Sequence, residues 1–270
     1  MLKSWKKLII CLFALAAITL SPPSAFVVGA SNTSERIVLL SPAVADIVER
    51  LGVAGEIVAV SSSIVEFPQA TRVGTHINPC MECIAAVKPT LIIGTSRFSQ
   101  QAADKLHAKL YKYEPSSIDN ILSSIVDVGK LLGRAKKAGE LVSELNKVLS
   151  DVAPLAKRAT VLYEVRSNPL SLAGRETIMS DALSRAGLVN LFGNARTSAV
   201  SSEYVLATNP DYYIYQVGTM NAKPTLPTER KGWNRLKSQV WRVDETIFAR
   251  ANTNVIYEIA RINKMLRDAQ

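Results

Sequence analysis

Histidine and cysteine are scarce in this chain of 270 residues, which has two histidines and three cysteines. Catalytic sites and metal centres draw many of their nucleophiles, bases and ligands from these two residue types. The sequence also has no Gly-x-Ser-x-Gly turn and no glycine-rich phosphate loop, because its glycines are scattered. We therefore expect no catalytic residues and no enzymatic activity.

Runs of basic residues interleaved with aromatic ones are also absent from the sequence. Aromatic residues make up 6% of the chain, and charged residues make up 20%. The formal net charge is +9, but the lysines and arginines are dispersed. A nucleic-acid-binding face needs a concentrated basic surface. We therefore expect no nucleic-acid partner.

The N-terminus carries the one segment that reads as membrane-directed. Three lysines within the first seven residues precede an apolar run at 8–20, which is shorter than the roughly 20 residues that span a bilayer. Small residues suited to cleavage follow it. The pattern predicts a signal peptide over residues 1–30, cut after Ala30, and hence export to the periplasm. The alternative is an uncleaved anchor helix. Cys11 follows Ile10, where a lipoprotein signal would have a small residue, so we expect no lipidation.

Strand-like and helix-like segments alternate along the rest of the chain. A β-type run at 36–40 leads through Ser41 and Pro42 into a helical segment, and a second β-type run follows at 56–60. Such a unit favours a parallel sheet. The second half of the chain repeats the order of strand, helix, short helix, proline and strand. We therefore expect an α/β fold.

A helical stretch over residues 117–158 separates the two halves. Apolar residues recur there at spacings of three and four, and Gly133 divides the stretch into two helices. Pro154 falls near the end of the second helix, which would be roughly 30 Å long if it ran for about twenty residues. One interpretation is a stiff bridge between two lobes. The alternative is one more packing helix in a single domain.

Four segments, in order along the chain, carry a family resemblance. They are RIVLLSPAVADIVERLGVAGEIVAVS, RVG followed by MECIAAVKPTLIIG, NPLSLAGRETIMSDALSRAGLVNLF, and SSEYVLATNPDYYI. Together they resemble the periplasmic substrate-binding proteins of ABC importers for iron-siderophores, haem and cobalamin. The similarity covers nearly all of residues 36–267.

The resemblance implies a fold of two α/β lobes with parallel-type sheets, joined by one long helix, with the ligand cleft between the lobes. The implied divisions are the signal peptide at 1–30, an N-terminal lobe at 31–132, a bridging helix at 133–157 and a C-terminal lobe at 158–270. It also implies that a rigid connector allows only small closure when ligand binds.

The function implied by the resemblance is capture of a metal-chelate in the periplasm. The ligand would be a corrinoid such as cobalamin, haem or a ferric siderophore, and the segment NPLSLAGRETIMSDAL is marginally closer to the corrinoid and metal-chelate branch. A monomer would deliver the chelate to an ABC importer permease with its ATPase. The protein would need no cofactor of its own.

The resemblance further implies two docking carboxylates, one in each lobe, that meet arginines of the permease. By segment match these are Glu82 and Glu203. Each falls in the first turn of a short predicted helix, where the helix dipole favours any acid by about 0.3–1 kcal/mol. An ordinary first-turn acid is therefore the alternative for both.

Loops that follow strands supply the candidate ligand contacts, because ligands bind at the carboxyl ends of parallel strands in open α/β sheets. The candidates are Ser41, Ser62, His76, Arg97, Arg166, Tyr215 and Trp233. The arginines can pair with carboxylate or phosphate groups, the aromatic rings can stack on a flat macrocycle, and His76 is the candidate axial nitrogen for haem iron or corrinoid cobalt. Surface ion pairs, core packing and a loop histidine bonded to backbone are the alternatives.

Cys80 and Cys83 follow His76 at spacings of four and three residues. We favour a disulfide, because the predicted export places the chain in an oxidising compartment. Free thiols remain an alternative, as does a metal site with His76, although structural zinc needs a fourth ligand. The pair also leaves open an exported thiol-redox or metal-binding protein. The family pattern has no cysteines at these positions.

Overall fold

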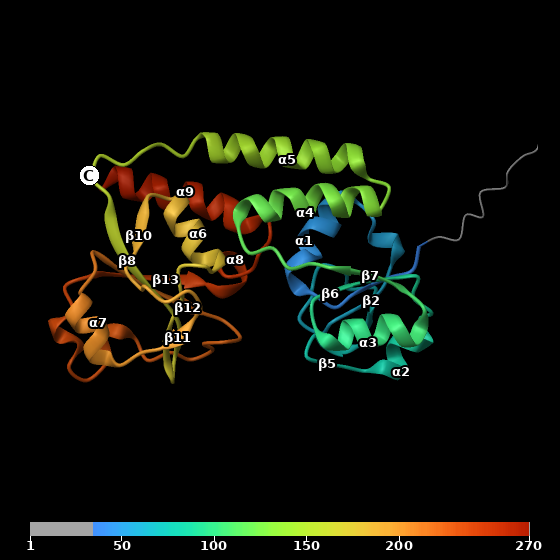
Figure 1. The fold of residues 1–270 in the computed structure, drawn as a ribbon, viewed down its shortest axis with the longest axis horizontal. Coiled ribbons are helices and arrows are strands. Elements are labelled where there is room, and N and C mark those ends of the chain that lie inside the picture. The colour runs from blue at the N-terminus through green and yellow to red at the C-terminus, as the bar shows by residue number, and fades with distance from the viewer. Residues whose placement is uncertain (1–34, 270) are drawn as a thin grey trace, which may run out of the picture. The chain divides into compact units, whose positions relative to one another are not determined.

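The computed structural model describes residues 35–269. The predicted signal peptide, its cleavage after Ala30 and the alternative anchor helix lie outside the described residues. The described chain forms two main sheets with helices packed on them, and α4 (Ile118–Leu131) and α5 (Ala135–Ser150) lie between the two in sequence (Figure 1). We refer to the elements from β1 to β7 as the first lobe and to those from β8 to α9 as the second lobe.

The first lobe contains a five-stranded parallel sheet in the order β3-β2-β1-β6-β7. Its central strands are short, fully buried apolar runs, as expected for a parallel sheet covered on both faces. The strands are β1 (Ile37–Leu39), β2 (Ile57–Val60), β3 (Thr71–Arg72), β6 (Leu91–Gly94) and β7 (Lys109–Lys112), with the hairpin β4 (Gly74–Thr75) and β5 (Asn78–Pro79). The helices are η1 (Pro42–Val44), α1 (Ala45–Leu51), η2 (Ala54–Glu56), α2 (Met81–Ala86) and α3 (Arg97–Leu106).

The second lobe contains a mixed sheet in the order β11-β9-β8-β12-β13, with β10 also paired to β8. Strands β8, β10, β12 and β13 are parallel, whereas β9 and β11 run antiparallel to their neighbours. The strands are β8 (Ala159–Ser167), β9 (Leu170–Leu172), β10 (Leu188–Asn190), β11 (Ser198–Ala199), β12 (Tyr212–Val217) and β13 (Gln239–Asp244). The helices are α6 (Ile178–Arg185), α7 (Ser202–Thr208), η3 (Pro227–Glu229), η4 (Trp233–Arg235), α8 (Glu245–Phe248) and α9 (Asn254–Asp268). The two sheets confirm the predicted α/β class.

The helical stretch divides where Gly133 predicts it to divide. Gly133 has a positive φ of 64°, a conformation that glycine adopts without strain, and α4 ends just before it. Helix α5 has 16 residues and is therefore about 24 Å long, shorter than expected. It ends at Ser150 because Pro154 disfavours helical backbone just before it and cannot donate the hydrogen bond that a further turn requires. No helix within residues 35–269 is long and apolar enough to cross a membrane.

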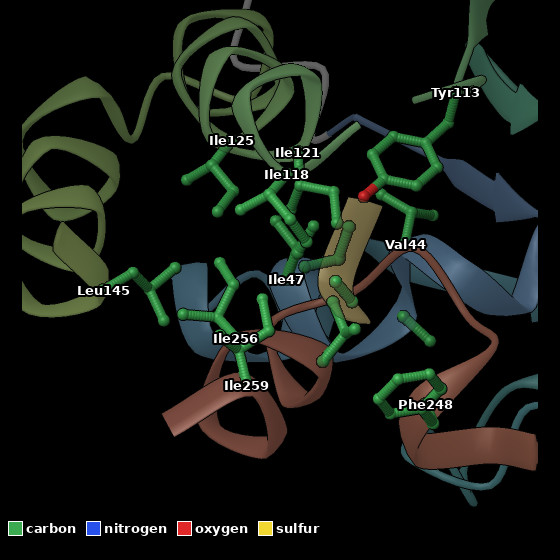
Figure 2. Close-up of a cluster of buried hydrophobic side chains, with 14 of the residues drawn as sticks. Val44, Ile47, Tyr113, Ile118, Ile121, Ile125, Leu145, Phe248, Ile256 and Ile259 are labelled. Atoms are coloured by element: carbon green, nitrogen blue, oxygen red, sulfur yellow. The ribbon is translucent and has the colours of Figure 1, made fainter. Parts of the chain in front are cut away.

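A single apolar core continues from the first lobe into the second. The cluster contains side chains from α1, α4 and α5 together with side chains from α8 and α9 (Figure 2). Members labelled in the figure are Val44, Ile47, Tyr113, Ile118, Ile121, Ile125, Leu145, Phe248, Ile256 and Ile259. Close-packed interiors of this kind resist shear between their parts. The two lobes are therefore joined by packing as well as by the connecting chain.

Polar bonds reinforce this seam between the lobes. The Oδ2 atom of Asp46, on α1, accepts hydrogen bonds from the backbone N–H of Thr253 at 3.0 Å and from its hydroxyl at 2.5 Å. Arg50, also on α1, pairs with Glu144 of α5 at 2.8 Å and donates to the Tyr257 hydroxyl of α9 at 3.0 Å. Helices from the first lobe, the connecting pair and the second lobe thus meet in one bonded group.

Candidate functional site

A cavity of about 510 Å³ lies between loops of the two lobes. This volume is typical of sites for small molecules. The first lobe lines it with residues 41–43, Ser63, 75–77, Thr95 and 113–115, and the second lobe lines it with 219–220, Glu245 and 249–251. Most of these segments directly follow parallel strands, namely β1, β2, β6 and β7 in one sheet and β12 and β13 in the other. The carboxyl ends of both sheets therefore open onto one site, as the strand-end argument predicts.

Two of the predicted contact residues, Ser41 and His76, line this cavity. Ser41 is 5% exposed, and its hydroxyl does not cap the helix that follows. His76 is exposed between β4 and β5. The hairpin is tight because Gly74 has a φ of +82° and a Cβ there would lie 2.7 Å from the carbonyl oxygen of Asn78. The exposed Ile77 lies beside His76 at the same hairpin end and also lines the cavity.

Three other predicted contact residues, Ser62, Arg97 and Arg166, lie outside the lining of this cavity. Ser62 is exposed and its backbone N–H donates to the Gly74 carbonyl at 2.7 Å, so that its neighbour Ser63 lines the cavity instead. Arg97 begins α3 with its guanidinium 4.9 Å from the ring centre of Phe98. Arg166 is still within β8, which runs two residues further than the sequence pattern indicates.

Tyr215 and Trp233 also lie outside the cavity lining, in a buried apolar cluster of the second lobe. They are 6% and 3% exposed and belong to a buried cluster with Tyr213. The Trp233 ring meets the Tyr213 ring edge-on at 5.3 Å, and the Arg230 guanidinium lies 4.6 Å from the Trp233 ring centre. Core packing is therefore the observed arrangement for these rings.

Three further residues of the cavity lining, Tyr113, Met220 and Glu245, are not among the contacts predicted from the sequence. Tyr113 and Glu245 each come directly after a strand, so the strand-end rule applied with the observed strand limits would have found them. The Tyr113 hydroxyl donates to the carbonyl of Ala251 at 2.5 Å and so joins the two lobes beside the cavity. Glu245 is 8% exposed, and its Oε2 accepts from the backbone N–H of Met220 at 2.7 Å.

A buried ion pair between Glu164 and Arg230 holds the connection that forms part of the second-lobe wall. Glu164 is fully buried, and its two carboxylate oxygens accept hydrogen bonds from the two terminal guanidinium nitrogens of Arg230, at 2.5 and 2.8 Å. The Tyr213 hydroxyl also donates to Glu164. Burial, followed by the charge of Glu164, raises the pKa of Tyr213 well above its usual value, so this hydroxyl keeps its proton. The pair fixes the chain between β12 and β13, because Arg230 lies within that connection.

Cys80 and Cys83 are joined by a disulfide in the structure. The Cys80 sulfur also accepts from the backbone N–H of Cys83 at 3.2 Å and so caps α2. Both sulfurs are therefore committed to the cross-link rather than held as thiolate ligands beside His76. Within residues 35–269, no three histidine, cysteine or acidic side chains are grouped closely enough to hold a metal ion.

Glu82 and Glu203 are both exposed in the first turns of α2 and α7. These helices lie on the side of each lobe away from α4 and α5 (Figure 1). The pKa of Glu203 is lowered by its own backbone N–H and by the Ser201 hydroxyl, so its carboxylate is charged at neutral pH. Each lobe thus presents one exposed acid at a helix start.

Known proteins resemble this chain along most of its length. The sequence profile of a family described as periplasmic binding protein matches residues 37–227. YvrC, an uncharacterized ABC transporter substrate-binding lipoprotein of Bacillus subtilis, is 24% identical over an alignment of 245 residues that covers 82% of this chain and 76% of YvrC. A vitamin B12-binding protein of Yersinia pestis is 23% identical over 197 residues, covering 68% of this chain and 70% of its own. The crystal structure of S. aureus IsdE complexed with heme has a TM-score of 0.74 at 21% identity, covering 86% of this chain and 98% of IsdE, and supports the fold.

Proposed function

Because the chain belongs to the periplasmic binding protein family, we propose that it captures a metal-chelate after export and delivers it to an ABC importer permease with its ATPase. Members of this family are binding proteins of transporters rather than enzymes. The observation that carries the proposal is the cavity into which the parallel strands of both lobes open. A ligand held there touches both lobes at once, as a carrier requires.

The proposed ligand is a corrinoid such as cobalamin, haem or a ferric siderophore. The cavity has an apolar lining from Ile77, Tyr113 and Met220, which suits the face of a macrocycle or the carbon skeleton of a chelator. His76 from the first lobe and Met220 from the second are the nitrogen and thioether donors on its walls. Both are donor types that iron and cobalt chelates accept. Arg250, also on the wall, can pair with a ligand carboxylate.

Purification of the exported protein without added ligand tests this function. Its absorption spectrum and intact mass under native conditions should reveal a Soret band, a corrinoid spectrum or the mass of a siderophore. The emptied protein should then bind haemin, cyanocobalamin or a ferric hydroxamate in titration. If the emptied protein bound none of these three probes, the metal-chelate class would be excluded. For the axial role, His76→Ala should weaken binding or shift the spectrum, and an unchanged affinity and spectrum would exclude it.

We further propose that Glu82 and Glu203 dock the permease. Exposure of both acids, one per lobe, supports this role. Glu82→Arg or Glu203→Arg should leave ligand affinity unchanged and impair uptake by cells, because an arginine there would repel the arginines of the permease. Glu140→Arg is a matched control, since Glu140 is an exposed helical acid on α5. Normal uptake by cells carrying either docking variant would contradict the docking role of Glu82 and Glu203.

We propose that residues 1–30 are removed after Ala30 and that the exported protein is a monomer with lobes at 31–132 and 158–270 and a bridge at 133–157. The core that continues through both lobes supports small closure on binding. An N-terminal sequence beginning at Ser31 is the expected result, and scattering profiles with and without ligand should differ little.

A further inference from the structure

The second lobe presents Thr219 and Met220 to the cavity on a four-residue turn, residues 218–221. The turn is closed by the N–H of Asn221, which donates to the Gly218 carbonyl at 3.1 Å, and by the reciprocal bond at 3.4 Å. Met220 is 47% exposed at its tip. An exposed apolar tip of this kind loses side-chain and backbone entropy when a ligand orders it. A turn that is already held in place before the ligand binds therefore favours higher affinity.

One side of the turn is held by Glu245, the first residue of α8. Its buried carboxylate accepts from the backbone N–H of Met220 at 2.7 Å, which fixes the tip itself rather than its flanks. Gly218 makes this approach possible. A Cβ at position 218 would lie 2.4 Å from the Cβ of Glu245 and 2.6 Å from its Oε2. Glycine at this position therefore serves the contact with Glu245.

The other side of the turn is held by Asn221, which is 5% exposed. Its side-chain oxygen accepts from the backbone N–H and the hydroxyl of Ser167, at 3.0 and 2.9 Å. Its side-chain nitrogen donates to the carbonyl of Gln216 at 2.8 Å. The base of the turn is thus fixed to β8 and β12. Among residues 35–269, the bond that Glu245 accepts from Met220 is the only side-chain bond to the part of the turn that faces the cavity.

We propose that Glu245 is a positioning residue for ligand capture, which presets the Thr219–Met220 tip against the cavity before ligand arrives. This proposal rests on the proposed function, because it takes the cavity as the ligand site. A charged acceptor on a backbone N–H is among the stronger hydrogen bonds in proteins. Presetting the tip removes an ordering cost from the binding step, so the ligand meets a formed wall on the second lobe.

The test compares three variants of neighbouring acids. Glu245→Ala removes the acceptor, whereas Glu245→Gln keeps an oxygen that can accept from Met220. Asp244→Asn is the matched control, because Asp244 is an exposed acid one residue away whose carboxylate accepts from the backbone N–H of Thr246 at 2.7 Å and so caps α8, and an asparagine keeps a capping oxygen. Two quantities are measured for each, namely amide hydrogen exchange at Met220 without ligand and affinity for haemin, cyanocobalamin and a ferric hydroxamate.

Glu245→Ala should speed Met220 exchange and weaken affinity about tenfold each, as loss of one charged hydrogen bond predicts. Asp244→Asn should match the wild type in both. Glu245→Gln should lose less than Glu245→Ala in both, because a neutral oxygen still accepts from Met220 but more weakly than a carboxylate does. If Glu245→Ala does not fold, Gly218→Ala tests the same contact by displacing Glu245, with the same expectation. Unchanged Met220 exchange, or faster exchange with unchanged affinity for a probe that the wild type binds, would overturn the proposal. If the wild type binds none of the probes, the metal-chelate class fails, while the exchange data still decide whether Glu245 holds the tip.

Discussion

The two lobes hold their walls of the cavity by different means. Among the described residues, the buried polar side chains of the first lobe are three serines. Those of the second lobe include two glutamates, a glutamine and three asparagines. Backbone bonds hold the first-lobe wall, and the Cys80–Cys83 disulfide lies in the same lobe outside the lining, whereas Glu164 and Glu245 anchor the second-lobe wall through bonds of their carboxylates.

This difference indicates how each wall will fail. A buried charge is stable only with its partners in place, so removal of one partner leaves a large uncompensated cost. A backbone-bonded loop with a short cross-link has no such single point of dependence. We therefore expect the second lobe to be the more sensitive to substitution and the first lobe to be the more sensitive to reductant.

The largest effect is expected from breaking the buried pair of the second lobe. Arg230→Ala leaves Glu164 without its guanidinium partner at a site that is fully buried, which should lower the free energy of unfolding by about 3–5 kcal/mol. Arg261→Ala is the control, because Arg261 is half exposed and pairs with Glu258 on the surface of α9, where the loss should stay within about 1 kcal/mol. Urea denaturation measures both. Similar losses from the two variants would show that the buried pair of the second lobe is no more sensitive to substitution than a surface pair.

A smaller effect is expected from cutting the cross-link of the first lobe. Replacing both cysteines by serine should cost about 2 kcal/mol, the loop-closure value for so short a separation. A serine at position 80 keeps an oxygen that can cap α2, so the change isolates the cross-link. Reductant should lower the melting temperature of the wild type and leave the double variant unaffected. Two reactive thiols in the exported protein without reductant would contradict the disulfide.

The smallest effect concerns Asp46, an acid of the first lobe that lies against the second. Burial raises the pKa of Asp46 above 3.8, although its bonds to Thr253 oppose this. A raised pKa means that the folded protein holds the proton more tightly than the unfolded chain does. The free energy of unfolding should therefore fall as pH rises from about the unfolded pKa through the folded pKa. Asp46→Asn should flatten this dependence in urea titrations. An identical slope in both proteins would show that Asp46 does not contribute to it.

The sequence pattern locates the first lobe, the helix pair and the two short helices that carry Glu82 and Glu203. These features depend on local signals, such as helical periodicity, Gly133 and the β-type runs of the parallel strands. Strands β9, β10 and β11 were missed because runs of two or three residues carry no measurable periodicity.

Side-chain environments of the second lobe could not be predicted for a different reason. Tyr215 and Trp233 are aromatic residues beside loops, and only the packing of distant segments decides whether they face a cleft or a core. Glu164 lies in an apolar strand, and its partner Arg230 follows 66 residues later. Ser63 lines the cavity and its neighbour Ser62 does not, and a loop sequence carries no periodicity that distinguishes two adjacent serines.

The central claim is that the ligand occupies the cavity between the lobes, and filling this cavity tests it most directly. Thr219 is exposed on the cavity wall, so Thr219→Trp should fold normally and place an indole in the ligand's space. Leu226→Trp is the control, because Leu226 is 41% exposed in the same connection but outside the lining. Titration with the metal-chelate that the wild type binds should show affinity lost in Thr219→Trp and kept in Leu226→Trp. Wild-type affinity in Thr219→Trp would contradict the account.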